Sequence, residues 1–306
     1  MTKAVKRDFC AVLLVCAFAP FSLKAAKEGP GPDAATIVQR SIAVNTADWK
    51  AQPQYSHEEH NTKTKIDSGG DAKSTISKRY EVTMIEGSPY SRLIGIDNEP
   101  LTAAQAQQER DKLNREIRRR RNESPVQRSA RIAKYQADRS EEHLLMQQMV
   151  DAFHFRLNRE EQIDGIDCYL LDAIPNPDYS PPVEKARVLL GMKGHLWIDK
   201  AEYHWVKVQA EVIKPVQFGL FIAQVKPGTK FELEQAPVGG VWLPKRFMES
   251  VNASIFGFYG MRSRQEEHYS NYELIADRTA GHPPSHTVAA AEAALNGSGH
   301  GGSREH

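Results

Sequence analysis

Basic side chains are concentrated in one short stretch of the chain, "REIRRRRNESP", where five arginines occur within seven positions. Guanidinium groups gathered in this way could bind the phosphates of nucleic acid or of an anionic membrane surface. The net charge of the whole chain is only +1, so the stretch is a local feature and no nucleic-acid partner is predicted. Four successive residues of an α-helix turn through about 300°, which would distribute the arginines around the helix axis.

We therefore interpret the stretch as the solvated end of one helix, before Ser124 and Pro125 begin the next. The alternative is attraction to an anionic membrane surface, where phospholipid headgroups would be the accessible anions. The candidate residues for that surface are Arg115, Arg118, Arg119, Arg120 and Arg121.

Two pairs of histidines have spacings that could suit a metal ion. His57 and His60 are three residues apart, but the surrounding sequence alternates as in a strand, which would point them to opposite sides. His195 and His204 flank a turn and could approach each other across a hairpin, where polar pairing between strands is the expected role. No metal site is predicted.

Motifs for catalysis are missing from the sequence. It contains no glycine-rich phosphate loop, no nucleophile elbow and no HExxH motif. The carboxylates of Glu141 and Glu142, and of Glu266 and Glu267, are adjacent and so project in different directions. Cys168 lies in a strand-like run, where a buried, unreactive thiol is expected. We predict no catalytic residue, no cofactor and no enzyme, and an unrecognised hydrolase has no motif to support it.

The N-terminus has the layout of a secretory signal peptide. Lys3, Lys6 and Arg7 precede an apolar run, and small residues follow at Ala25 and Ala26. The run is short for a membrane span, although an uncleaved anchor is the alternative. We expect residues 1–26 to direct export to the periplasm or cell envelope, which would leave Cys168 as the single cysteine.

Periodicity divides the remaining chain into strands and helices. A helix capped by Asp33 precedes strand-like runs that meet at the turn "DSGGD". From Thr102 to Phe153 the period is helical, with capping boxes at Thr102 and Ser124 and a third helix expected to open at Ser140. Alternating runs with turns at Asp164-Gly165 and Gly239-Gly240 then continue to about residue 276.

The predicted fold is α+β and mainly antiparallel β. It is a curved, half-open β-barrel with an N-terminal helix and an inserted, lid-like helical segment at about 102–153. One domain is expected over residues 27–278. The tail at 279–306 is rich in Ala, Gly, Ser and His, and we expect it to be disordered because it has too few large apolar side chains.

Three short patches carry a resemblance to a known family: "GHLWIDKAEYHWVKVQAEV", "GGVWLPKRFMES" and "EEHYSNYELI". With the order of elements, they resemble the LolA/LolB-like superfamily of periplasmic lipoprotein carriers and outer-membrane lipoprotein-sorting proteins. The resemblance implies a half-barrel whose concave face is apolar, is covered by helices, and holds acyl chains or a lipidated partner.

The function expected is non-catalytic binding of a lipid or lipidated ligand. An envelope sensor or protein-interaction module of the same fold is the alternative. The candidate cavity and lid residues, which could instead be ordinary core, are Leu145, Met149, Phe153, Trp197, Trp205, Val206, Val208, Phe231, Trp242 and Phe247.

Overall fold

The computed structural model describes residues 31–219, 223–256 and 259–275. The chain divides into two units, Met1–Pro32 and Asp33–His306, and every helix and strand described below belongs to the second. The predicted signal peptide and the predicted tail lie outside the described residues.

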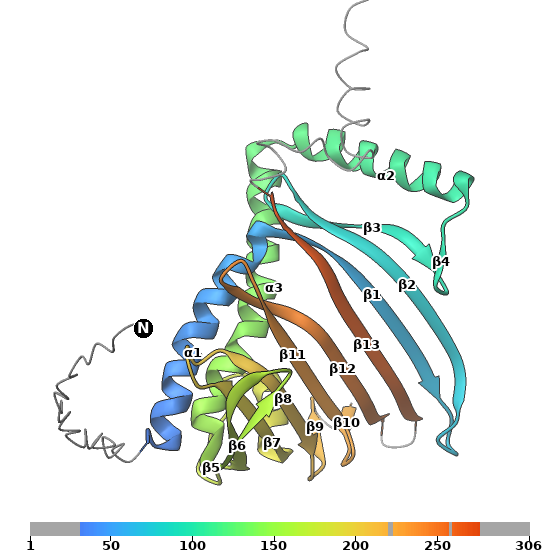
Figure 1. Ribbon diagram of the computed structural model, residues 1–306. Coiled ribbons are helices and arrows are strands. Elements are labelled where there is room, and N and C mark those ends of the chain that lie inside the picture. The colour runs from blue at the N-terminus through green and yellow to red at the C-terminus, as the bar shows by residue number, and fades with distance from the viewer. Residues whose placement is uncertain (1–30, 220–222, 257–258, 276–306) are drawn as a thin grey trace, which may run out of the picture. The chain divides into compact units, whose positions relative to one another are not determined.

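Helices and strands follow one another in the predicted order (Figure 1). The helices are α1 (Ala34–Ala51), η1 (Gln52–Gln54), α2 (Ala103–Arg121), α3 (Pro125–Ala152) and η2 (Glu184–Gly191). The strands are β1 (Tyr55–Ile66), β2 (Ala72–Ile85), β3 (Ser88–Ile96), β4 (Glu99–Pro100), β5 (Phe153–Ile163), β6 (Ile166–Pro175), β7 (Met192–Asp199), β8 (Trp205–Val212), β9 (Val216–Phe218), β10 (Ala223–Val225), β11 (Lys230–Val238), β12 (Val241–Ile255) and β13 (Tyr259–Leu274).

The strands form one antiparallel sheet with the order β4-β3-β2-β1-β13-β12-β11-β8-β7-β6-β5. The first strand therefore pairs with the last, from Tyr55↔Leu274 to Ile66↔Arg262. Because β4 and β5 end this order, the sheet is curved but not closed in the described residues. The predicted α+β fold with an open half-barrel is confirmed.

Local sequence explains the turns and most of the helix ends. Asp164 and Gly165 have φ values of 49° and 85°, the left-handed pair that a tight hairpin between β5 and β6 needs. Both predicted capping boxes are present, at Thr102 with Gln105 and at Ser124 with Gln127.

The prediction of a separate helix at Ser140 is wrong. Ser140 lies inside α3, which runs without a break from Pro125 to Ala152. No glycine or proline interrupts the helix after Pro125, so residues of high helix propensity carry it through the Ser-Glu-Glu pattern. In the described residues, no helix is long and apolar enough to span a membrane.

Helix α1 is joined to the sheet by buried polar contacts. The Nε1 of Trp205 donates to the Oγ of Ser41 at 3.0 Å. Asp48 lies 2.7 Å from the Nδ1 of His204 and accepts from the backbone N–H of Trp242 at 3.2 Å. Asp48 and His204 are both buried, so the contacts fix the end of α1 against β8 and β12.

Candidate functional site

One face of the sheet can be followed across its whole width by strand register. Directly paired residues of an antiparallel sheet point to the same side. The pairs join, in order, Val208, Leu233, Phe247, Glu267, Asn61 and Lys78. Val208 packs against the buried cluster formed by α1 with β6, β7 and β8. We call this side the helix-side face and the other the opposite face.

On the β5–β8 part of the helix-side face, α1 and α3 fill the space with side chains. One cluster contains Ile37 and Val38 of α1 with Leu171, Leu196 and Ile198 of the sheet. The second is built by the end of α3, η2 and the sheet: Ala152, Phe153, Ala173, Tyr179, Ala186, Leu189, Met192 and Val212. This part is ordinary close-packed core.

The long strands continue the same face beyond this core, and in Figure 1 they extend to the lower right, past α1 and α3. Half-buried apolar side chains lie here in two groups, both outside the core clusters. The first is on β2 and β3 (Tyr80, Val82, Met84 and Leu93), and the second is on β11 and β12 (Leu233, Phe247 and Val251). We call them the two apolar groups.

Between the two apolar groups, β1 and β13 carry polar side chains. Glu267 accepts hydrogen bonds from Asn61 at 3.2 Å, from Gln265 at 2.6 Å and from the hydroxyl of Tyr269. Burial, and then the charge of Glu267, raise the pKa of Glu59 and of Glu249 above the usual range. We call Glu59, Glu249 and Glu267 the carboxylate group. The proton affinity of Glu59 and of Glu249 is high because each of these two charges is partly removed from water and lies near the charge of Glu267.

Aromatic side chains border the carboxylate group at the start of β1. The His57 ring lies 5.7 Å from that of Tyr269 and 5.2 Å from that of Tyr272. Burial lowers the pKa of His57 to about 4, so its imidazole is neutral at neutral pH. Burial also raises the pKa values of both tyrosines, which keeps their hydroxyls protonated.

The predicted cavity and lid residues are divided between the two faces. Leu145, Met149, Phe153, Phe231, Trp205 and Val208 belong to, or pack against, the helix-side clusters. Phe247 belongs to the second apolar group. Trp197, Val206 and Trp242 lie on the opposite face, in a separate buried cluster with Cys168 and Leu170. Residues on the two faces of the sheet cannot contact the same ligand, so these candidates do not form a single site.

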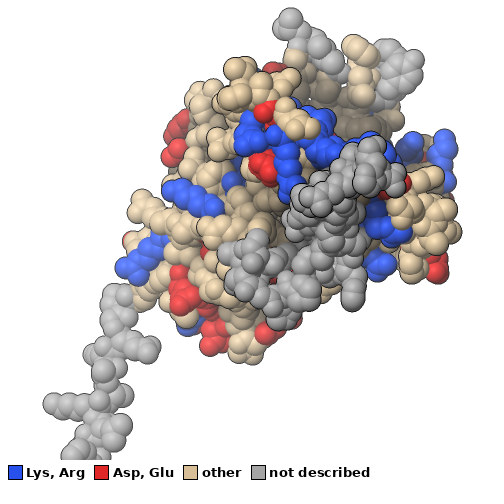
Figure 2. Space-filling model, turned by 90° about the horizontal axis from the view of Figure 1, so that it is seen from above, with Lys and Arg blue, Asp and Glu red and all other residues tan. Residues whose placement is uncertain are grey.

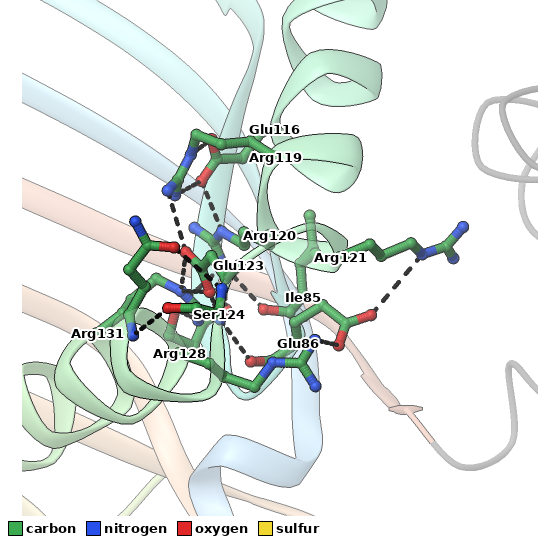
Figure 3. Close-up of polar contacts among 12 residues, drawn as sticks. Ile85, Glu86, Glu116, Arg119, Arg120, Arg121, Glu123, Ser124, Arg128 and Arg131 are labelled. Atoms are coloured by element: carbon green, nitrogen blue, oxygen red, sulfur yellow. Dashed lines mark hydrogen bonds and ion pairs between the residues drawn. The ribbon is translucent and has the colours of Figure 1, made fainter.

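The arginine run ends α2 and also contacts the hairpin between β2 and β3 (Figure 3). Arg120 is only 6% exposed, so the prediction of a solvated helix end is wrong for this residue. Its guanidinium donates to the backbone oxygens of Ile85, Ser88 and Pro89 at 2.9, 2.8 and 3.1 Å. These carbonyls belong to the hairpin between β2 and β3, a partner that helical periodicity does not reveal.

Neighbouring charges complete the contact between the hairpin and the α2–α3 junction. Arg119 and Arg131 both bind Glu123, at 3.0 and 2.7 Å. Arg121 lies 3.7 Å from Glu86. The Arg120 guanidinium also lies 5.9 Å from the ring centre of Tyr90, which by its register with Thr83 is on the opposite face.

Arg115 and Arg118 remain as exposed members of the run. The side chain of neither forms a hydrogen bond or ion pair with any other residue that the structure describes. Figure 2, seen from above Figure 1, shows Lys and Arg side chains gathered on that side of the protein with few acidic ones between them. A role at an anionic surface stays a prediction, and Arg120 cannot contribute to it.

The histidine and cysteine predictions have clear outcomes. His57 and His60 lie on opposite faces, as predicted for a strand. His195 and His204 do not meet, because His195 pairs across the strands with Asp172 at 3.1 Å while His204 binds Asp48. Burial raises the pKa of Cys168 to about 11, which confirms a buried, unreactive thiol. No group of metal-binding side chains is found within the described residues.

Sequence reasoning missed the carboxylate group. Glu59, Glu249 and Glu267 are on three strands and far apart in sequence, so only the pairing of β1 with β13 and of β13 with β12 brings them together. Alternation within each strand could have indicated that all three share a face, but only after that strand order was known.

The chain matches no protein-family model and no curated protein. Solved structures similar to it include a DUF1329 family protein from Desulfovibrio piger, with 13% identity, a TM-score of 0.31, and coverage of 82% of this chain and 98% of that one. A LolA superfamily protein from Nitrosomonas europaea has 13% identity, a TM-score of 0.28, and coverage of 79% and 94%. A domain described as an outer membrane lipoprotein-sorting protein, from Vibrio parahaemolyticus, has 12% identity, a TM-score of 0.30, and coverage of 82% and 97%. A protein of the superfamily that the sequence patches resemble is thus among these matches. Identities and TM-scores this low carry no information on ligand or partner.

Proposed function

We propose that the chain is a non-catalytic binding protein that holds a lipid or lipidated ligand against the helix-side face of its long strands. The observation that supports this most directly is the position of the two apolar groups, which are half-buried and outside the core clusters. Apolar side chains left at the edge of a core gain stability when another apolar surface covers them, at about 0.8 kcal/mol for each buried methylene.

The carboxylate group restricts the chemistry of the ligand. A bare hydrocarbon that covered both apolar groups would also bury Glu59, Glu249 and Glu267 without new partners, which is unfavourable. An amphiphile can instead place a hydrogen-bond donor or a cationic group over the carboxylates and its acyl chains over the apolar groups. A lipid or a lipidated protein has such a combination.

Apolar side chains at the far end of the same face extend the proposed surface. Ile76, Ile255 and Met261 are 54%, 38% and 47% exposed, and their registers place them on the helix-side face. Together with the signal-peptide pattern of residues 1–26, these features favour binding in the periplasm or cell envelope.

Native mass spectrometry of protein purified from its own envelope fraction tests this proposal. A co-purifying lipid mass is expected, and it should be lost when the face is made polar by Val82→Ser with Phe247→Ser. Ile174→Ser is the matched control, because Ile174 is 46% exposed and its register with His154 on β5 places it on the opposite face. A clean mass of the chain alone, or loss of lipid in the control as well, contradicts the proposal.

The alternative is a sensor or interaction module that binds a protein partner. The exposed guanidinium groups of Arg115 and Arg118 are the feature that favours it, because they would suit an acidic surface. In the same experiment, a specific protein partner without lipid would support this alternative.

A further inference from the structure

An arginine without a partner lies on the opposite face of the sheet. Arg79 of β2 pairs in register with His60 of β1, whereas its neighbour Lys78 pairs with Asn61 on the helix-side face. The Nε of Arg79 is buried and has no hydrogen-bond acceptor. Across the described residues, its guanidinium takes part in no hydrogen bond or ion pair. A buried, unpaired donor is costly, and most so when it carries a charge.

This guanidinium lines a small pocket of about 90 Å³. The volume corresponds to about three water molecules, which is room for one polar group and not for an acyl chain. The residues around it come from four strands and a turn: His60, Ser77, Arg79, Gly95, Asn98 and Glu99.

Hydrogen-bonding side chains gather beside Arg79. The Nε2 of His60 lies 2.5 Å from the Oγ of Ser77, and this hydroxyl also lies 3.4 Å from the Oδ1 of Asn98. Ser77 is 8% exposed. Among the described residues that line the pocket, Glu99 alone carries a carboxylate, and this residue is exposed.

Backbone geometry keeps the pocket open. Asp97 and Asn98 have φ values of 50° and 67°, and Asp97 holds this turn to Ser77 by accepting from its N–H at 3.1 Å. A Cβ on Gly95 would lie 2.9 Å from the backbone oxygen of Glu99 and 3.2 Å from a terminal nitrogen of Arg79. The position thus leaves no room for a larger residue without displacing the guanidinium.

We propose that this pocket binds an oxyanion, a carboxylate or phosphate group, on the Arg79 guanidinium, with His60 and Ser77 as further hydrogen-bonding partners. Arginine presents a rigid fork of donors that matches the two oxygens of such a group, and it stays charged at all physiological pH values. The bound oxyanion gives the guanidinium an acceptor, which it lacks among the described residues. The site lies on the other side of the sheet from the proposed lipid-binding face and does not depend on that function.

The Ser77–His60 contact also resembles the nucleophile and general base of a hydrolase, but the residues around it favour anion binding over catalysis. In the described part of the chain, the second ring nitrogen of His60 has no carboxylate to orient it, as such catalysis requires. The unpaired guanidinium is explained by a bound anion and not by a hydroxyl nucleophile.

Titration of the full chain with sodium acetate and with inorganic phosphate, at constant ionic strength in chloride, tests the site. Binding is followed by NMR through the ring signals of His60 and the amide of Ser77. We expect saturable shifts, an affinity at least about tenfold lower in Arg79→Gln, and a higher affinity in Glu99→Gln, where the repelling charge is removed. Arg187→Gln is the matched control for net charge, because Arg187 is exposed on η2 and away from the pocket, and it should behave as wild type.

The source of the oxyanion is distinguished by vesicles of phosphatidylglycerol compared with vesicles of phosphatidylcholine. The oxyanion is a lipid headgroup if the protein binds vesicles of phosphatidylglycerol but not those of phosphatidylcholine. Added phosphate should then compete with this binding, and Arg79→Gln should abolish it. Saturable binding of the free anions without vesicle binding identifies a soluble small anion. The proposal is overturned if neither anion shifts these signals, or if Arg187→Gln weakens binding as much as Arg79→Gln. If Arg79→Gln does not fold, an unchanged affinity in Glu99→Gln overturns it.

Discussion

The guanidinium of Arg120 donates a 2.8 Å hydrogen bond to the backbone oxygen of Ser88, which connects the end of α2 to the hairpin between β2 and β3. Through this contact, the most basic stretch of the sequence helps to hold the fold together. It also separates the arginines by role, since Arg120 is buried while Arg118 is exposed on the same helix.

Replacing Arg120 should therefore destabilise the fold. Arg120→Ala leaves the carbonyls of Ile85, Ser88 and Pro89 and the carboxylate of Glu116 without this partner. We expect a loss of about 3 kcal/mol in the free energy of unfolding, measured by urea denaturation. Arg118→Ala is the control and should change it by less than about 0.5 kcal/mol. Equal effects of the two substitutions would contradict the structural role.

The buried contact between Asp48 and His204 should also be needed for stability. Asp48→Ala removes the acceptor for His204 and for the N–H of Trp242, which are both buried. The expected loss is about 3 kcal/mol, by the same measurement. Glu202→Gln is the comparison, because Glu202 also faces His204 but is 74% exposed, and it should have almost no effect. An Asp48→Ala protein as stable as wild type would show that this contact contributes little to holding α1 against the sheet.

Glu59 should make stability depend on pH in the direction opposite to most carboxylates. Its pKa is raised in the folded protein by burial and by Glu267, so the folded state holds its proton more tightly than the unfolded state, whose value is 4.5. Stability from this group is present below pH 4.5 and is lost as pH rises through the folded pKa. Glu59→Gln should raise the Tm at pH 7 and leave it unchanged near pH 4. A lower Tm at pH 7 would contradict the burial of this charge.

Glu116 should show the reverse dependence. Hydrogen bonds from Arg119 and Arg120 lower its pKa to about 2, against an unfolded value of 4.5. Its stabilising effect is therefore complete above pH 4.5 and is lost as pH falls through about 2. Glu116→Gln should lower the Tm at pH 7, and the difference from wild type should shrink as the pH is reduced towards 2. A Tm difference that stays constant over this range would exclude the ion pairs as its cause.

Cys168 should resist alkylation in the folded protein. It is fully buried, and burial raises the pKa of its thiol to about 11, so very little thiolate forms at pH 8. With Cys10→Ser and Cys16→Ser in place, iodoacetamide should modify the chain only after denaturant is added. Rapid modification without denaturant would mean that β6 opens readily.

Much of the fold was predictable because its signals are local. Alternation marked most of the long strands, and side-chain caps marked the starts of α2 and α3. Arg120 and Ser140 are two residues for which the local sequence predicted the wrong structure. Arg120 is buried by carbonyls from a hairpin more than thirty residues away, and the cap-like pattern at Ser140 is overridden by uninterrupted helix propensity.

The candidate sites depend on strand order, which the sequence does not contain. Trp197 and Trp205 are both aromatic strand residues, yet a register shift between β7 and β8 after Trp197 places them on different faces. The lack of a partner for the Arg79 guanidinium is also not predictable from the sequence, because it depends on which residues β1 and β3 place beside it. Such relationships arise from pairing and not from periodicity.

The position of β13 between β1 and β12 has a consequence for how the chain matures. Within the described residues, the strands β1–β4 and β5–β12 form two halves that are joined along the sheet only by β13. When the chain appears with its N-terminus first, as it does during synthesis, the sheet cannot be completed until β13 has also appeared. Until then, the edges of β1 and β12 are open to pairing with other chains, and such open edges favour aggregation.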